Sequence, residues 1–332
     1  MKEALYYKKL DNKKVQCLLC PHHCLILSGK RGICGVRENR EGILYSLNYN
    51  FVSSIALDPI EKKPLYHFHP GKFILSVGTV GCNFKCPYCQ NWRISQVSPD
   101  EFELEKIDSY KLISLARSYK SFGIAYTYNE PFIWYEFVLE TSKIAKEQNL
   151  ENVLVTNGYI EEEPFLELAP YISAMNIDLK SFNEEFYSKL CQGKLEKVLN
   201  IILLAYKKGI HIEITTLIIP GWNDKEDEIK ELTNWIASID KNIPLHFSRY
   251  FPAYKFNLSP TPLETLWKAY SIAKEKLNYV YLGNIWNLET STTFCPKCKN
   301  QLIIRNGYTI EKNLLLNTNT CPFCGEKISV II

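Results

Sequence analysis

The strongest constraint on the fold is an alternation of short apolar segments with helix-patterned segments. Between the apolar runs lie amphipathic stretches with helical spacing, for example 109–122 and 225–239. Strands that alternate with helices form βαβ units and a parallel sheet. We therefore predict an α/β fold, a partial barrel of the (β/α)6 type. The apolar runs with the length of buried strands are 73–77, 124–128, 152–156, 174–179, 210–218, 244–247 and 279–282.

Three cysteines follow the first predicted strand, in the segment GCNFKCPYCQNW. Cys82, Cys86 and Cys89 can bind three irons of a cubane cluster and leave the fourth iron open to a small ligand. A structural zinc site that borrows a distant fourth ligand is the alternative. Disulfide bonds are not expected, because the start of the chain lacks the apolar region of a secretory signal.

Polar side chains stand where the later strands are predicted to end. In α/β barrels the chemistry gathers at the carboxyl ends of the strands, so we expect these side chains around the cysteine loop. A single such residue is usually a cap or a surface group, but a series at one barrel edge indicates a site. The candidates are Tyr88 in the loop itself, Asn129, Glu130, Thr156, Asn157, Asp178, Lys180, Thr216, His246 and Arg249.

The C-x3-C-x2-C segment, with an aromatic residue before its last cysteine, resembles the signature of the radical S-adenosylmethionine (SAM) superfamily. The resemblance implies a [4Fe-4S] cluster on Cys82, Cys86 and Cys89, with SAM chelating the open iron. It also implies reductive cleavage of SAM to methionine and a 5′-deoxyadenosyl radical, which abstracts hydrogen from a substrate.

The same resemblance implies roles for residues at the strand ends. Glu130 would accept a hydrogen bond from the methionine amino group of SAM. Lys180 would hold the SAM carboxylate, with Asp178 orienting it or facing the ribose. Tyr128 and Asn129 stand where the superfamily carries two glycines before its glutamate, so the backbone part of the SAM contact departs from the pattern.

Within the superfamily the chain resembles the activase-like branch, the relatives of pyruvate formate-lyase activating enzyme. It is most similar there to the AmmeMemoRadiSam system radical SAM enzymes. This resemblance implies Memo-type and AMMECR1-type proteins as partners, besides an electron donor. The stretches that carry it are 20–37, 63–68, 126–131, 176–180, 215–224 and 246–255.

The carboxyl-terminal cysteines form two C-P-x-C knuckles, which is the pattern of a zinc ribbon. Cys295, Cys298, Cys321 and Cys324 supply four thiolates, enough to close a tetrahedral zinc site with no catalytic vacancy. An iron site of the rubredoxin kind is the alternative. A segment this short folds with the help of its metal, so we expect a structural role.

The amino-terminal cysteines also offer four thiolates. Cys17, Cys20, Cys24 and Cys34 bind either zinc or a second iron–sulfur cluster, and zinc is favoured because nothing nearby in the sequence suggests an electron path. Cys191 lies outside all three groups, and we expect it to be a small buried side chain.

The predicted division is an amino-terminal metal-binding module over 1–62, the barrel over 63–292 and the zinc ribbon over 293–332. Both ends are basic: residues 1–40 carry nine Lys and Arg against three Asp and Glu, and residues 295–332 carry five against two. These charges either complement the acidic middle of the chain or attract an acidic partner such as RNA. With no apolar stretch long enough to span a membrane, we expect a cytoplasmic protein.

A radical SAM enzyme acting on an unidentified substrate is the favoured function. The alternatives are a glycyl-radical enzyme activase and a radical SAM enzyme that modifies RNA. A non-catalytic scaffold is disfavoured, because scaffolding does not need an iron with an open coordination position.

Overall fold

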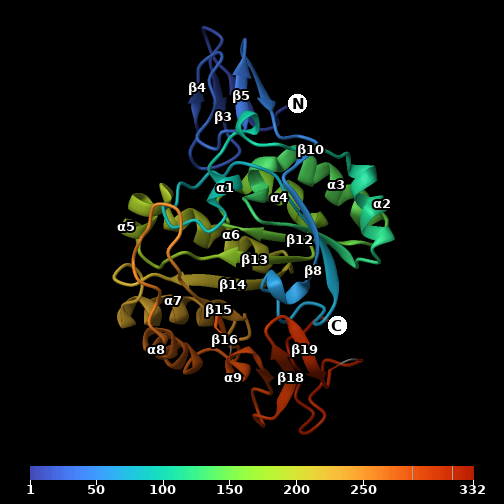
Figure 1. The fold of residues 1–332 in the computed structure, drawn as a ribbon, viewed down its shortest axis with the longest axis vertical. Helices are drawn as coiled ribbons and strands as arrows, with labels where there is room; N and C mark the ends of the chain where they lie inside the picture. Colours follow the sequence, from blue (N-terminus) through green and yellow to red (C-terminus); the bar gives the residue numbers. More distant parts are fainter. Residues whose placement is uncertain (286, 316) are drawn as a thin grey trace.

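One sheet of eight strands runs through the middle of the molecule, between the two cysteine-rich ends (Figure 1). The computed structural model describes residues 1–285, 287–315 and 317–332. In spatial order the strands are β16, β15, β14, β13, β12, β11, β9 and β8. Their bounds in that order are Val280–Gly283, Leu245–Arg249, His211–Ile218, Ala174–Asp178, Glu151–Thr156, Gly123–Tyr126, Phe73–Gly78 and Ser54–Pro59.

The parallel part of this sheet confirms the predicted α/β fold. Strands β9 and β11 to β16 pair in parallel with their neighbours, and all seven apolar runs of the sequence lie on them. β9 and β11 to β15 supply the six strands of the predicted (β/α)6 type, and β16 adds a seventh parallel strand to the barrel. The barrel is partial, because β16 and β8 form the two edges of the sheet.

The edge strand β8 is not among the predicted strands. It pairs antiparallel with β9 along its whole length, from Ser54 opposite Gly78 to Pro59 opposite Phe73. Most of its residues are only partly buried, so the segment lacks the apolar run that marks the inner strands. The main sheet therefore includes residues that the predicted division assigns to the amino-terminal module.

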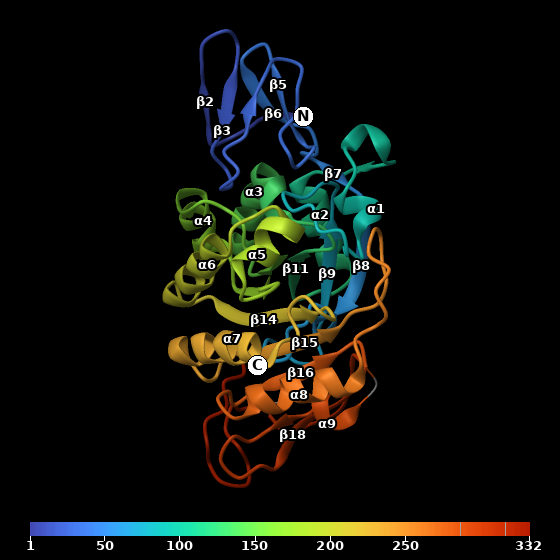
Figure 2. The same cartoon turned by 90° about the vertical axis from the view of Figure 1, so that its left-hand side faces the viewer.

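Helices connect successive parallel strands, as the alternating pattern predicts. The first ends at Ser118 rather than at 122, because Lys120 adopts a left-handed conformation with φ 52°. In Figure 2, α7 (Glu226–Ile239) lies below β14 and beside α8 (Leu263–Lys274), with which it is in contact. The connecting helices are α2 (Ser109–Ser118), α3 (Tyr135–Glu147), α4 (Glu162–Leu168), α6 (Leu195–Lys207), α7 (Glu226–Ile239) and α8 (Leu263–Lys274).

Shorter elements join these parts. A strand pair, β7 (Phe51–Val52) with β10 (Glu105–Lys106), lies beside the barrel. The remaining helices are α1 (Trp92–Ser95), α5 (Glu184–Phe186) and α9 (Leu288–Ser291), four 3-10 turns at Ile60–Lys62, Pro99–Glu101, Pro131–Trp134 and Ala169–Tyr171, and a π turn at Tyr187–Cys191.

The amino-terminal module forms the blue tier at the top of Figure 1. It consists of two small antiparallel sheets, ordered β1-β6-β5 and β2-β3-β4. The buried side chain of Arg37 forms an ion pair with Glu136 on α3, and Glu136 also accepts from the backbone N–H of Leu5 at 2.8 Å. The module is thereby fixed to the barrel. Its strands are Lys2–Glu3, Tyr7–Lys9, Val15–Cys17, Leu25–Ile26, Arg37–Arg40 and Ile43–Ser46, for β1 to β6.

The carboxyl-terminal ribbon is the red tier at the bottom of Figure 1 and contains β17 (Thr293–Phe294), β18 (Gln301–Asn306) and β19 (Thr309–Asn313). Arg305 is completely buried and donates to the Tyr66 carbonyl at 2.6 Å and to Thr293 Oγ1 at 2.8 Å. The ribbon therefore shares a core with the barrel instead of hanging from it as an appendage.

Across the described residues, none of the helices has both the length and the apolar character needed to cross a membrane.

Candidate active site

A cavity of about 820 Å³ opens where the parallel strands end. This volume is in the range of small-molecule binding sites. Each of the seven parallel strands contributes to its wall, either directly or through the loop that follows it. The candidate residues predicted at the carboxyl ends of the strands therefore lie around an open cavity.

Cys82, Cys86 and Cys89 all line this cavity, and they are the only cysteines among its lining residues. Their sulfur atoms do not form a group within 4.8 Å of one another, unlike the ribbon cysteines. Ligands to a single ion must lie closer together than ligands to different irons of a cluster. The three cysteines are therefore not packed as the compact ligand set of one ion, and each can hold a different iron of a [4Fe-4S] cluster.

Side-chain amides hold the cysteine loop in place. Asn129 accepts from the Thr79 N–H at 3.0 Å and donates to the Gly81 carbonyl at 2.9 Å. Asn83 donates to the Tyr159 carbonyl at 2.7 Å. Asn129 lines the cavity as predicted, but both ends of its amide are used to position the loop, which explains an asparagine at a glycine position of the superfamily pattern.

Cys86 is surrounded by groups that favour its thiolate form. A hydrogen bond from Cys191 lowers the pKa of Cys86 to about 7 against the effect of burial, and Lys180 acts in the same direction. Tyr88 Oη lies 3.4 Å from the Cys191 sulfur. Thiolate is the form that binds metal. Cys191 is buried as predicted, but it belongs to the immediate surroundings of the cysteine loop.

Glu130 lies on the cavity wall with its carboxylate buried. It accepts hydrogen bonds from Thr156 Oγ1 at 2.6 Å, from the Asn157 N–H at 2.8 Å and from the Phe132 N–H at 3.0 Å. Burial raises the pKa of Glu130 to about 7, although these donors oppose the rise. A carboxylate of this kind suits an ammonium ligand, which would stabilise its ionised form.

Thr156 and Asn157 also line the cavity, at the end of β12. The Asn157 amide donates to Asn83 Oδ1 at 2.8 Å and lies 3.8 Å from the Cys82 sulfur. This residue therefore links the cysteine loop to the carboxylate of Glu130, to which its backbone N–H donates.

Lys180 and Asp178 form an ion pair of 2.6 Å on the same wall. Burial would lower the pKa of Lys180, but Asp178 and Cys86 outweigh it and raise that pKa above its usual value. The neighbouring Asn176 Oδ1 is buried and has no hydrogen-bond partner among the described residues. A paired cation and an unpaired acceptor fit a ligand with both a carboxylate and hydroxyl groups, as SAM has.

Two predicted residues lie off the wall. Thr216 Oγ1 donates to the Leu179 carbonyl at 2.8 Å, while Thr215 and Leu217 on either side of it line the cavity. Side chains alternate along a strand, so a shift of one residue changes the face. Arg249 donates to the Thr261 carbonyl at 2.8 Å, away from the cavity.

His246 lines the cavity as predicted, but its Nε2 is held by Glu213 Oε2 at 2.6 Å. Burial alone would raise the pKa of Glu213, yet His211 and His246 keep it well below its usual value. Glu213 also accepts from the backbone N–H groups of Tyr66 and His67. His246 therefore belongs to a buried network of polar side chains with Glu213 and His211.

Several wall residues are absent from the predicted site. Lys63 donates to Asp58 Oδ2 at 2.7 Å, and burial lowers the pKa of Lys63 to about 8. Tyr128 Oη donates to the same carboxylate at 2.6 Å. Because the stretch 63–68 carries part of the family resemblance, the sequence did contain a signal that could have identified Lys63. Tyr308 reaches the wall from the turn between β18 and β19, and no local pattern indicates this.

The two outer cysteine groups differ in geometry. In the ribbon, Cys295 and Cys324 sulfurs lie 3.6 Å apart, as do those of Cys298 and Cys321. All four lie within 4.8 Å of one another, which confirms a cysteine cluster able to bind a metal. The amino-terminal group has no such close set among the described residues. Its members are nevertheless neighbours, because Cys17, Cys24 and Cys34 add to the effect of burial in raising the pKa of Cys20.

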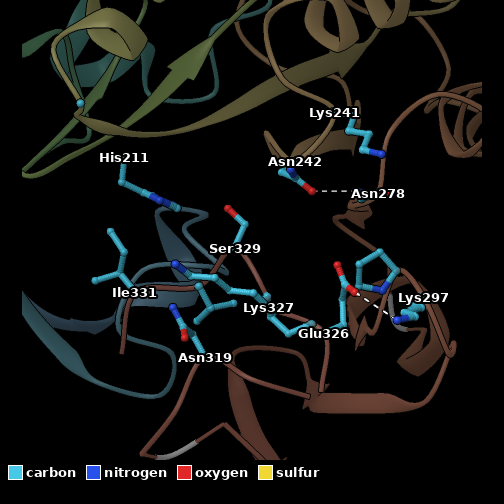
Figure 3. A pocket seen from close by; sticks show the side chains of 14 residues that line it. His211, Lys241, Asn242, Asn278, Lys297, Asn319, Glu326, Lys327, Ser329 and Ile331 are labelled. Carbon is cyan, nitrogen blue, oxygen red and sulfur yellow. Dashed lines mark hydrogen bonds and ion pairs between the residues drawn. The ribbon is translucent and has the colours of Figure 1, made fainter. Parts of the chain in front are cut away.

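A second cavity, of about 680 Å³, lies between the ribbon and the end of the barrel opposite the cysteine loop. Figure 3 shows His211, Lys241 and Asn242 on the barrel side and Lys327 and Ser329 on the ribbon side. It is at the amino ends of the strands, where barrel enzymes do not place their chemistry. The candidate active site is therefore the cavity that contains the cysteine loop.

Residues 76–233 match the radical SAM superfamily. The chain is 46% identical to an uncharacterized protein of Methanocaldococcus jannaschii over the full length of both. It is also 23% identical to the pyruvate formate-lyase 1-activating enzyme of Escherichia coli, over 48% of this chain and 68% of that protein. The crystal structure of Streptococcus suis SuiB bound to S-adenosylmethionine aligns with a TM-score of 0.52 at 14% identity, over 68% of this chain and 53% of that one, and shows the same fold.

The chain belongs to the radical SAM superfamily and is related to the activating enzymes of pyruvate formate-lyase. That family implies an iron–sulfur cluster and SAM, and the cavity residues described above fit both.

Proposed function

We propose that this protein is a radical SAM enzyme whose cluster is held by Cys82, Cys86 and Cys89. When bound, the cluster and SAM supply an electron-driven cleavage that yields a 5′-deoxyadenosyl radical for hydrogen abstraction from a substrate. The observation that carries the proposal is the convergence of these three cysteines with Glu130 and the Lys180–Asp178 pair on one cavity wall.

The residues of the chain have distinct tasks in this proposal. Glu130 binds the amino group of SAM. Thr156 and Asn157 donate hydrogen bonds that orient the Glu130 carboxylate. Lys180 binds the SAM carboxylate and stays protonated because Asp178 lies beside it.

Substrate and partners are proposed from the resemblance of the sequence. We propose that the enzyme works with Memo-type and AMMECR1-type proteins, and that it takes its electron from a separate donor. The wide cavity supports a substrate larger than SAM alone, because its wall extends from the cysteine loop to Tyr308 in the ribbon.

The proposal is tested by isotope transfer. Reduced enzyme and SAM are incubated with deuterated cell fractions that contain the partner proteins, and deuterium in 5′-deoxyadenosine is measured. Transfer that needs Cys82, Cys86 and Cys89 is the expected result. Deuterium-free 5′-deoxyadenosine with every fraction would contradict hydrogen abstraction from a cellular substrate.

A glycyl-radical activase is the second candidate, and the relationship to the E. coli activating enzyme favours it. An activase would leave a stable glycyl radical on a partner protein. Its electron paramagnetic resonance (EPR) signal, in a reaction with a glycyl-radical enzyme from the same organism, would distinguish this candidate from the first.

A further inference from the structure

The four amino-terminal cysteines are arranged as an enclosed group. Cys17, Cys20 and Cys34 are buried, and Cys24 is partly exposed. The backbone N–H of Cys17 donates to the Cys24 carbonyl at 3.0 Å, which brings the two ends of the segment together. An Arg37 nitrogen lies 3.8 Å from the Cys17 sulfur. These features place the four cysteine side chains in one largely buried group.

The spacing of the sulfur atoms separates a single ion from a cluster. Four thiolates about 2.3 Å from one zinc ion lie roughly 3.8 Å apart in a tetrahedron. The ribbon cysteines show this spacing, with sulfur pairs at 3.6 Å. Neither the amino-terminal cysteines nor Cys82, Cys86 and Cys89 contain three sulfurs within 4.8 Å of one another. In this respect the amino-terminal group differs from the ribbon, as the cysteine loop does.

The amino-terminal group also lies directly against the loop of the catalytic cluster. Gly81, which precedes Cys82, has φ 90°, and a Cβ atom there would lie 2.6 Å from the Cys34 carbonyl oxygen. His22, between Cys20 and Cys24, has its Nε2 2.8 Å from the Asn83 carbonyl. Two cysteine loops that are distant in the sequence therefore touch on both sides of Cys82. The sequence alone does not suggest this contact between the two cysteine groups.

We propose that Cys17, Cys20, Cys24 and Cys34 bind a second iron–sulfur cluster, which passes electrons to the cluster on Cys82, Cys86 and Cys89. One electron from a low-potential carrier protein reduces the second cluster, which is reoxidised when it reduces the catalytic cluster. No atom is transferred. The basic character of residues 1–40 suits an acidic carrier. This inference rests on the proposed function, since the receiving cluster is the one proposed there.

Metal analysis of the full chain, purified without oxygen, tests the inference. We expect about eight irons, four per cluster, and about one zinc per chain. A Cys82→Ala, Cys86→Ala, Cys89→Ala variant should keep about half of the iron. A Cys17→Ala, Cys20→Ala variant should also keep about half, and a Cys295→Ala, Cys298→Ala control should lose zinc only.

Two zinc ions per wild-type chain, with all iron lost in the triple variant, would overturn the inference while leaving the proposed function intact. Iron content unchanged in the triple variant would instead overturn the proposed function. If the amino-terminal variant fails to fold, the triple variant still decides, because its amino-terminal cysteines are intact. In dithionite-reduced wild type, EPR signals broadened by coupling of two nearby clusters are expected. A spectrum equal to the sum of the two variants' spectra would refute the electron path.

Discussion

Replacing Glu130 with glutamine probes the hydrogen-bond geometry of the active site. The carboxylate accepts from Thr156 Oγ1 and Phe132 N–H on one oxygen and from Asn157 N–H on the other. A glutamine amide has one acceptor oxygen, so its NH2 group must face at least one backbone N–H in either orientation. One buried donor is then left unpaired, which costs about 1–3 kcal/mol of unfolding free energy.

The same substitution removes the charge proposed to bind the SAM ammonium group. A hydrogen bond to a charged partner contributes about 1.5–3 kcal/mol, so SAM affinity should fall roughly ten- to a hundredfold. Affinity is measured by calorimetry on cluster-loaded protein, and stability by urea unfolding of the same samples.

Glu228→Gln is the matched control. Glu228 is also buried, also accepts from a hydroxyl (Ser181) and from a backbone N–H (Phe182), and burial raises its pKa in the same way, but it lies outside the cavity. Both donors meet the same oxygen of Glu228, so a glutamine amide can keep both hydrogen bonds. We therefore expect Glu228→Gln to keep its SAM affinity and to lose little stability. Equal SAM affinity in the Glu130 variant and in wild type, within twofold, would refute the assignment of Glu130.

The ionisation of Glu130, the ion pair of Arg305 and the metal site of the ribbon can each be perturbed separately. Because burial raises the pKa of Glu130 to about 7, its ionised form is lost below that pH. SAM affinity, measured by calorimetry, should therefore fall about fivefold from pH 7 to pH 6, and Glu130→Gln should abolish this fall. Arg305→Met leaves the buried Glu61 without its ion pair and should reduce the free energy of unfolding by about 3–5 kcal/mol. An unchanged midpoint of urea unfolding would contradict a core shared by the ribbon and the barrel. The double variant Cys295→Ala, Cys298→Ala should lose about one zinc per chain while the ultraviolet–visible spectrum of the iron–sulfur cluster persists. Zinc retained by this variant would show that the metal is not bound in the ribbon.

The sheet and the position of the cysteine loop were predictable from the sequence because both depend on local patterns. Buried parallel strands are apolar along their length, and the loop follows the first of them directly. The ribbon was predictable for the same reason, since two C-P-x-C knuckles specify a close cysteine cluster by themselves. The edge strand β8 was not, because a half-buried strand paired on one side needs no apolar run.

Residues that enter the site through packing were beyond local patterns. Thr215 rather than Thr216 lines the cavity, since one residue of register decides the face of a strand. Tyr308 comes from the ribbon, and Cys191 reaches the loop from a distant turn. The contact of Cys34 with Gly81 likewise depends on how the amino-terminal module docks on the barrel.

Reductive cleavage of SAM by the purified protein tests the central claim most directly. Cluster-loaded enzyme is reduced with dithionite without oxygen, SAM is added, and 5′-deoxyadenosine and methionine are quantified. The account predicts both products in equal amounts from the wild type, and none above background from the Cys82→Ala, Cys86→Ala, Cys89→Ala variant. Wild-type protein with a full cluster that forms no 5′-deoxyadenosine, or a triple variant that forms as much as the wild type, would contradict it.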